Sequence, residues 1–153
     1  MSKRERAAAR LAAVQALYQM DVAAKGLNEI FAEFEGFWMG QTIDGVEYND
    51  SDRKLFRDIV QGVLADQLGI DRTTDAALTD RWPLRRVEAV MRAVLRAATY
   101  ELRARAEIPA RVIITEYVDV AAAFLANDET GMVNAVLDHI ARDLRASEFA
   151  ARA

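Results

Sequence analysis

The chain has 153 residues, of which 52% are apolar and 29% charged, and its formal net charge is −4. This composition is typical of one globular domain with a sizeable core, and the absence of cysteine excludes disulfides and thiolate metal sites. No apolar run approaches the roughly 20 residues of a membrane span and no signal peptide is recognisable, so we expect a cytoplasmic protein with no membrane association.

Helix-forming residues dominate, with only two prolines and seven glycines, which predicts an all-α fold. The strongest helix signal lies in residues 1–20, where alanine is abundant. A stripe of apolar side chains at spacings of three and four is expected to face the core: Leu11, Val14, Tyr18 and Val22.

The same helix begins with a concentration of positive charge. Residues 1–10 carry a net charge of +3, whereas the rest of the chain carries −7. Lys3, Arg6 and Arg10 form a row about 80° from the apolar stripe. Cations at a helix N-terminus oppose the helix dipole, and an external anion such as nucleic-acid phosphate would relieve this. The alternative is a frayed, solvated terminus that aids solubility.

Three further helical segments are expected before residue 80. Residues 27–39 follow a break at Lys25 and Gly26, and residues 40–50 are expected to form a loop. A helix starting near Asn49 or Ser51 has an apolar face from Leu55 to Leu64, and a weaker helix at 70–78 follows a break at Gly69. Residues 37–39 (FWM) are an apolar group that either supports self-association or caps the core.

Residues 81–83 (RWP) mark the clearest division, so we expect helical subdomains at 1–80 and 81–153 within one compact domain. The helix at 84–106 carries an arginine row opposite its apolar face, formed by Arg85, Arg92, Arg96 and Arg103. This row is a nucleic-acid or partner surface, or a solvated face in which Glu88 pairs with Arg92. Glu101 falls on the apolar side and is expected to be a buried, satisfied carboxylate.

Two helices are expected after Ile108 and Pro109. The first is apolar nearly all round from Ile113 to Leu125, with Phe124 among the side chains expected to be buried, which is typical of the centre of a bundle. Asp128 is a candidate N-cap for the last helix, whose apolar face runs from Met132 to Leu144. The tail at 147–153 is expected to fray.

No catalytic pattern is recognisable. The one histidine, His139, has no second histidine or cysteine to share a metal with, and we expect it at the surface. The isolated glycines exclude P-loop and dinucleotide patterns, and acid pairs such as Asp128 and Glu129 fit the first turn of a helix. We expect neither an enzyme nor a cofactor, metal or small-molecule substrate.

Three stretches together resemble one family. They are residues 10–19 (RLAAVQALYQ), residues 94–102 (VLRAATYEL) with Ile108 and Pro109, and Phe124 with Asn127, Asp128 and residues 132–138 (MVNAVLD). In this order, over about residues 4–145, the chain resembles the bacterial transcription antitermination factors of the NusB family. The loop at 36–50 looks longer than is usual there.

The resemblance implies an all-helical protein of two small bundles, about seven helices in all, that is not an enzyme. Members bind the boxA RNA of ribosomal RNA operons together with the small-subunit ribosomal protein NusE and help RNA polymerase resist termination. By position, the implied RNA-binding residues are Lys3, Arg4, Arg6, Arg10, Gln15, Arg111, Asp128 and Met132. The implied partner-binding residues are Glu88, the best single candidate, and Arg92.

The chain departs from the family pattern at two places. Alanines occupy positions 7–9, where an arginine-rich run is usual, and Met132 stands where an aromatic residue is common. Fewer cations neutralise fewer phosphates, so we expect weak RNA binding by the chain alone and tight binding with the partner.

Two other functions are weighed against this one. The same helical domain resembles the N-terminal part of certain ribosomal RNA cytosine methyltransferases, but those need a catalytic domain with a cofactor loop and reactive cysteines. A protein-binding helical module, whose N-terminal cations contact only acidic partners, is the other alternative. Competition distinguishes RNA-specific binding from a contact of charge alone. RNA-specific binding persists in excess non-cognate RNA, whereas a contact of charge alone does not.

Overall fold

The computed structural model describes the backbone of residues 3–38, 42–43, 46–47, 50–78 and 88–150, and the side chains of 5–34, 53–78 and 88–149. Within these ranges the predicted all-helical class is confirmed, with one small hairpin added. The helices are α1 (Lys3–Ala23), α2 (Leu27–Trp38), α3 (Asp50–Ala65), α4 (Gln67–Ala77), α5 (Ala89–Ala104), α6 (Ala110–Ala122), α7 (Asn127–Leu144) and α8 (Ala146–Ala150). The antiparallel strands β1 (Thr42–Ile43) and β2 (Val46–Glu47) occupy the segment expected to be a loop.

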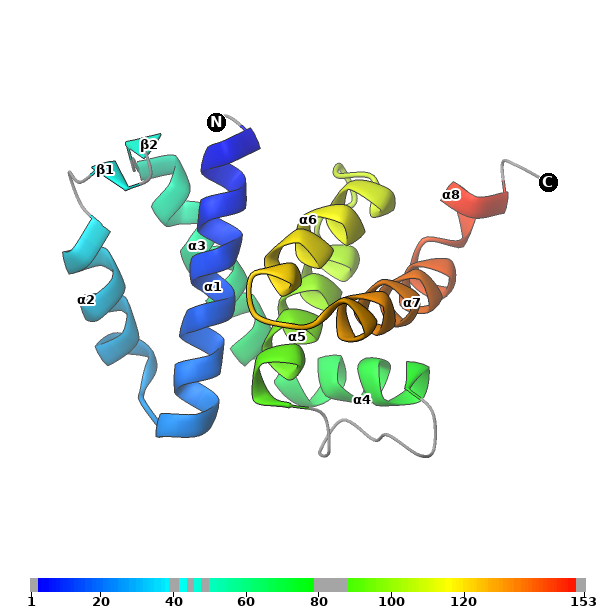
Figure 1. Ribbon diagram of the computed structural model, residues 1–153, viewed down its shortest axis with the longest axis horizontal. Helices are drawn as coiled ribbons and strands as arrows, with labels where there is room; N and C mark the ends of the chain where they lie inside the picture. The colour runs from blue at the N-terminus through cyan, green and yellow to red at the C-terminus, as the bar shows by residue number, and fades with distance from the viewer. Residues whose placement is uncertain (1–2, 39–41, 44–45, 48–49, 79–87, 151–153) are drawn as a thin grey trace.

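Helix α1 lies in the middle of the molecule (Figure 1). On one side are α2, the hairpin and α3, and on the other are α5, α6 and α7. Helix α4 crosses beneath and packs against both α5 and α7. The predicted division at residues 80–81 falls within 79–87, outside the described residues, and stays a prediction.

The buried face of α1 is built mainly from small side chains. The fully buried residues on it include Ala9, Ala12, Ala13, Ala16 and Leu17. Small side chains let the axes of packed helices approach closely, and α1 packs mainly against α3 and α5. The predicted apolar stripe is correct at Val14 but wrong at Tyr18 and Val22, which are 36% and 54% exposed.

Helix α5 is the centre of the fold. From Met91 to Leu102 all its side chains except Arg92 and Tyr100 are buried, and it packs against α1, α3, α4, α6 and α7. The prediction that the helix after Pro109 is central is therefore wrong. Helix α6 leaves Val112 exposed, and Phe124, just beyond its end, is 42% exposed.

Helices α3 and α5 pack closely at Gly62. A Cβ atom placed there would lie 2.1 Å from a ring carbon of Tyr100, so only glycine fits without a shift of the ring. The Tyr100 hydroxyl donates to the Asp58 carboxylate at 2.9 Å. Burial and this hydrogen bond raise the pKa of Tyr100 to about 12.

Several predicted helix ends differ from the structure. The break before α4 lies at Asp66, whose carboxylate accepts a hydrogen bond from the Gly69 N–H at 3.2 Å. Ala126 occupies the N-cap position of α7, so the prediction of an Asp128 cap is wrong and Asp128 lies in the first turn. Leu144, expected to be buried, is 39% exposed. Residues 37–39 lie outside the described side chains.

The end of the chain is more ordered than expected. Residues 146–150 form α8, so the prediction of a frayed tail is wrong for 147–150, and 151–153 lie outside the described residues. Glu148 accepts a hydrogen bond from the Ala110 N–H, and the Arg142 guanidinium lies 4.7 Å from the Phe149 ring centre. These contacts fix α8 against α6 and α7.

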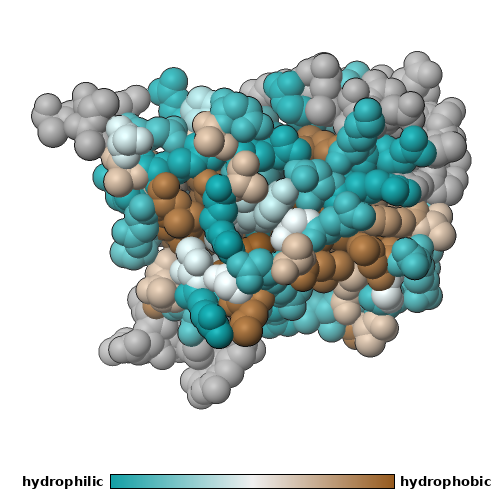
Figure 2. Space-filling view, turned by 180° about the vertical axis from the view of Figure 1, so that it is seen from behind, coloured by the Kyte–Doolittle hydropathy of each residue, from teal (hydrophilic) through white to brown (hydrophobic). Residues whose placement is uncertain are grey.

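One face of the molecule, shown in Figure 2, carries apolar side chains in separate areas divided by hydrophilic ones. Among the described helices, none is long and apolar enough to cross a membrane.

Candidate functional site

The cations at the start of α1 have different environments. The side chains of Lys3 and Arg4 lie outside those described, and Arg6 is half-buried. Arg10, by contrast, is 1% exposed. The prediction that Arg10 is exposed on the same edge as Lys3 and Arg6 is therefore wrong. Its assignment to the RNA contacts stays a prediction, which the enclosure of its guanidinium by protein disfavours.

Arg10, Glu101 and Tyr117 form a buried group that we call the Arg10 cluster. Arg10 donates twice to the Glu101 carboxylate, from Nε to Oε2 at 2.8 Å and from Nη2 to Oε1 at 3.0 Å. The Tyr117 hydroxyl donates to Oε2 of the same carboxylate. The expectation that Glu101 is a buried, satisfied carboxylate is confirmed. This residue of α5 bonds to Arg10 of α1 and to Tyr117 of α6, and so joins the three helices.

Other charged groups lie close to the Arg10 cluster. The Glu116 carboxylate is 4.0 Å from Arg10 Nη1, and Arg105 Nε is 3.8 Å from Glu101. Burial acts to lower the pKa of Arg10, but the hydrogen bond and charge of Glu101 outweigh it and raise that pKa. Burial and the charge of Glu101 raise the pKa of Tyr117 well above its usual value. Arg10 therefore stays charged and Tyr117 stays protonated.

The arginine row on α5 is occupied by ion pairs with other helices. Arg92 donates to Asp21 of α1 at 2.7 Å, Arg96 binds Asp71 of α4 at 2.8 and 2.9 Å, and Arg103 binds Asp66 at 2.8 Å. The interpretation of this row as a solvated face is wrong at Arg96, which is 8% exposed. Arg85 lies outside the described residues.

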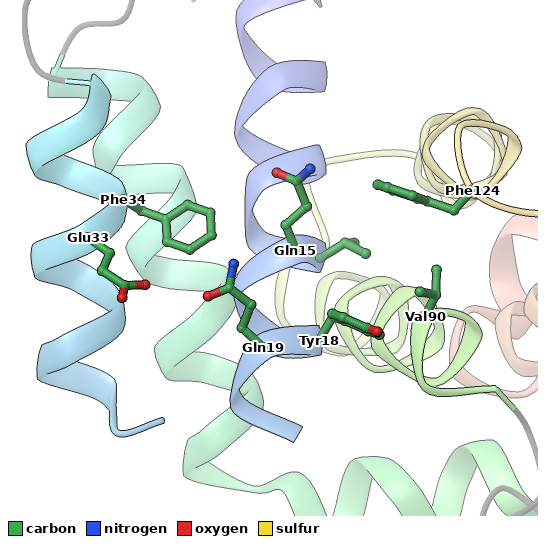
Figure 3. Close-up of a pocket in the computed structure, with 8 residues that line it drawn as sticks. Gln15, Tyr18, Gln19, Glu33, Phe34, Val90 and Phe124 are labelled. Atoms are coloured by element: carbon green, nitrogen blue, oxygen red, sulfur yellow. The ribbon is translucent and has the colours of Figure 1, made fainter. Parts of the chain in front are cut away.

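A pocket of about 620 Å³ lies along α1 between α2 on one side and the start of α5 on the other (Figure 3). Its lining comprises Val14, Gln15, Tyr18, Gln19, Glu33, Phe34, Val90 and Phe124. Gln19 projects toward Glu33 and Phe34 of α2, whereas Tyr18 projects toward Val90 of α5 (Figure 3). Among the predicted RNA-binding residues whose side chains are described, Gln15 is the one that lines this pocket.

Of the remaining predicted site residues, Arg111 lies at the start of α6, whereas Asp128 and Met132 lie beyond its end, in α7. Arg10 contacts Tyr117 of α6, and Tyr18 shares the pocket with Phe124 beyond the end of α6, so α1 and α6 run in the same direction. Arg111, exposed in the first turn of α6, therefore lies toward the basic start of α1. Asp128 is exposed at the start of α7, near Phe124 along the chain, and Met132 is half-buried against the core.

The two predicted partner-binding residues have different surroundings. Glu88 is exposed just before α5, and its side chain makes no capping hydrogen bond to that helix. Arg92 is held by Asp21, with only 18% of its side chain exposed. His139 is exposed as expected, and the described side chains contain no group of three or more potential ligands that could hold a metal ion.

Residues 7–142 match the sequence pattern that defines the NusB family. The chain belongs to the NusB family. Similar curated proteins include transcription antitermination protein NusB from Rhodopseudomonas palustris strain BisB18, 58% identical over 94% of this chain and 85% of the relative. NusB of Bradyrhizobium diazoefficiens is 57% identical over 94% of this chain and 87% of its own length.

The solved NusB structures agree with the fold. The structure of T. maritima NusB superposes with a TM-score of 0.79 at 29% identity, covering 94% of this chain and 96% of that one. A crystal structure of NusB and NusE in complex with double-stranded RNA has a TM-score of 0.78 at 22% identity, covering 93% and 99%, and shows the shared fold alone. NusB is a non-catalytic family of antitermination factors, so the chain is not an enzyme.

Several residues of the pocket are not predicted by the pattern of the sequence. Tyr18 and Phe124 were both expected to be buried, because apolar residues at helical spacing indicate a core. In the structure they are 36% and 42% exposed and line the pocket together. The one feature of the sequence that could have indicated a binding role for Tyr18 and Phe124 is their aromatic character, since exposed aromatic residues are typical of binding surfaces.

Proposed function

We propose that the protein acts in transcription antitermination by binding boxA RNA of ribosomal RNA operons together with a NusE-type ribosomal protein, as part of the RNA polymerase antitermination complex. Membership of the NusB family carries this proposal. A similar fold is seen in a NusB crystallised with NusE and RNA, which supports the choice of partners. The protein is then an adaptor that holds RNA and protein and performs no chemical step.

The basic start of α1 is the proposed contact for the RNA backbone. Lys3, Arg4 and Arg6 lie in its first two turns, and Arg111 lies in the first turn of α6 toward the same end. Arginine and lysine bind phosphates without regard to sequence, so these residues set the position of the RNA. Because Arg10 is buried, the cation row is shorter than its spacing suggested, which supports weak binding by the chain alone.

The pocket is the proposed site for single-stranded bases. Tyr18 and Phe124 offer aromatic surfaces on which bases stack, and the amides of Gln15 and Gln19 can both donate and accept hydrogen bonds. Sequence-specific RNA recognition relies on unpaired bases whose edges are accessible. Asp128 and Met132, near the start of α7, are proposed to extend this contact.

The partner is proposed to dock beside the pocket. Glu88 is exposed and lies two residues before Val90, which lines the pocket. Arg92, held by Asp21 of α1, contributes by fixing the start of α5 against α1. A partner at Glu88 would cover one rim of the base site, which explains why RNA and partner would bind best together.

Fluorescence anisotropy tests the proposal. Binding of boxA-containing and scrambled RNA is measured with and without the NusE-type protein, for the wild type, Arg6→Ala, Gln15→Ala and the control Arg103→Ala. We expect the partner to raise the affinity for boxA RNA only, and Arg6→Ala and Gln15→Ala to lose most of that gain while Arg103→Ala keeps it.

A different outcome would change the function. If neither RNA binds even with the partner present, the protein is a protein-binding helical module, and the aromatic pocket receives a side chain of that partner. If excess non-cognate RNA removes the boxA complex, the contact is one of charge alone and base recognition is absent.

A further inference from the structure

We propose that the Arg10 cluster is a positioning unit. It fixes the angle of α1 against α5 and α6 and so presents the basic start of α1 to RNA, while Arg10 itself contacts no RNA. This inference rests on the proposed function and adds a residue role that differs from the one expected for Arg10.

The burial of the cluster excludes direct contact in the folded protein. Arg10 is 1% exposed, Glu101 and Tyr117 are 0% exposed, and Nε and Nη2 of Arg10 both donate to the Glu101 carboxylate. An RNA phosphate could reach Arg10 only after a displacement of the helices that enclose it. A guanidinium in this position acts through the helix that carries it.

The cluster lies at the point where α1 becomes anchored. Residues 5–8 are all half-buried, and Ala9 and Arg10 are the first fully buried residues among the described side chains of α1. Arg6 stands one turn before Arg10, about 40° away around the helix axis. Any rotation or tilt of α1 at Arg10 therefore moves Arg6 and the residues before it directly.

An ion pair of this kind is suited to orientation more than to stability. Apolar side chains of similar volume often replace a buried ion pair without loss of stability, because desolvation opposes the attraction between the charges. Two parallel hydrogen bonds to one carboxylate, by contrast, define a distance and an angle. Here Glu101 is itself held by Tyr117, so α1 is aligned with α5 and α6 at the same time.

One bond of the cluster is left unmade, which supports the same conclusion. Arg10 Nη1 is buried and has no hydrogen-bond acceptor among the described residues, and the nearest carboxylate oxygen, on Glu116, is 4.0 Å away. An unsatisfied buried donor reduces stability. This nitrogen of the Arg10 guanidinium therefore adds no hydrogen bond that would stabilise the fold.

The test distinguishes a positioning role of the Arg10 cluster from a direct contact with RNA and from an effect on stability alone. The full-length Arg10→Met/Glu101→Leu double variant removes both charges and keeps apolar volume. We expect it to fold with the helix content of the wild type and to bind boxA RNA with NusE-type protein at least about tenfold more weakly. The slope of log K against log salt should stay at the wild-type value, because the same phosphate contacts form in the complex and the affinity falls only by the cost of bringing α1 to its wild-type angle.

Two control variants define the alternatives. Arg6→Ala should reduce the magnitude of that slope by about 0.7, the value for one phosphate contact on a single strand. Val63→Ala, a core truncation in α3, should lower the melting temperature and leave RNA affinity unchanged. If RNA affinity in the double variant equals that of the wild type, or if its slope falls as in Arg6→Ala, the positioning role is wrong.

Milder variants keep the proposal testable if the double variant does not fold. Tyr117→Phe removes only the hydroxyl bond to Glu101 and should weaken RNA binding several-fold with an unchanged slope. Arg10→Lys keeps the charge but not the two parallel bonds, so full affinity in this variant would overturn the proposal. Absence of RNA binding by the wild type itself, with partner present, would instead overturn the proposed function and this role with it.

Discussion

The arginines of α1 and those of α5 look alike in the sequence, since both sets recur at helical spacing on one side of a helix. In the structure they have different partners. On α5, Arg92, Arg96 and Arg103 pair with aspartates of α1, of α4 and of the N-cap position before α4, and their exposure varies along the helix. On α1, Arg10 is enclosed in the core while Arg6, one turn earlier, is only half-buried.

Helical spacing alone therefore cannot assign a role to a row of cations. Spacing decides which side chains share a face, but the acids that pair with them come from other helices. Asp21, Asp66, Asp71 and Glu101 all perform this function here, and none lies within four residues of its arginine in the sequence. The free energy of each pair then depends on how far it is buried.

The largest expected effect is at Arg10. Arg10→Ala leaves the Glu101 carboxylate buried without its main partner, so we expect unfolding free energy to fall by about 3–5 kcal/mol. Urea denaturation followed by circular dichroism measures this. The Arg10→Met/Glu101→Leu variant is the control and should lose much less. A loss below about 1 kcal/mol in Arg10→Ala would mean that water or a rearranged neighbour satisfies Glu101.

A smaller effect is expected at Arg96, which is 8% exposed and makes two hydrogen bonds to Asp71. Arg96→Ala should reduce unfolding free energy by about 1–3 kcal/mol, as for hydrogen bonds between charged groups that are partly buried. The same denaturation assay applies, with Asp71→Asn as the matched partner variant. Equal stability of Arg96→Ala and the wild type would show that burial does not strengthen this pair.

Arg103 should contribute least of the three pairs. It and Asp66 are both substantially exposed, with 35% and 54% of their side chains accessible, and water and salt screen such pairs. Arg103→Ala is expected to change unfolding free energy by no more than about 0.5 kcal/mol. A loss comparable to that of Arg96→Ala, persisting in high salt, would contradict the ranking by burial.

The most subtle test is the titration of Asp66. The hydrogen bond from Arg103, followed by that from the Gly69 N–H, lowers the pKa of Asp66. Because this pKa is lower in the folded state, the stabilisation is fully present above the unfolded value of about 3.9 and is lost as pH falls through the folded value. In Arg103→Ala, NMR titration should show the pKa of Asp66 rising toward its usual value. An unchanged pKa would assign the shift to Gly69 alone.

Much of the fold could be predicted from the residues. The all-helical class, the helix starting after Pro109 and the buried role of Glu101 followed from helix propensity, proline geometry and the position of a carboxylate among apolar neighbours. The motif from 132 to 138 indicated the family, which the match over residues 7–142 shows. These features depend on neighbours in the sequence or on the helix itself.

The candidate site was harder to predict. Gln15 lines the pocket as one of the expected RNA-binding residues, but Tyr18 and Phe124 were assigned to the core. Helical periodicity is judged mainly from large apolar residues, and it therefore does not predict that the alanine face of α1 is the buried one. That face packs on α3 and α5, and the larger side chains are consequently turned toward the pocket.

The sequence by itself determined where the helices form, which family the chain resembles and that Glu101 needs a buried partner. Only the tertiary structure decided that this partner is Arg10, that α5 and not α6 is central, and that Tyr18 faces a pocket. The physical reason is that helical periodicity fixes the angles of side chains around one axis. Which side of a helix becomes buried depends on how other helices pack against it. On α1 they pack against the side with the smallest side chains.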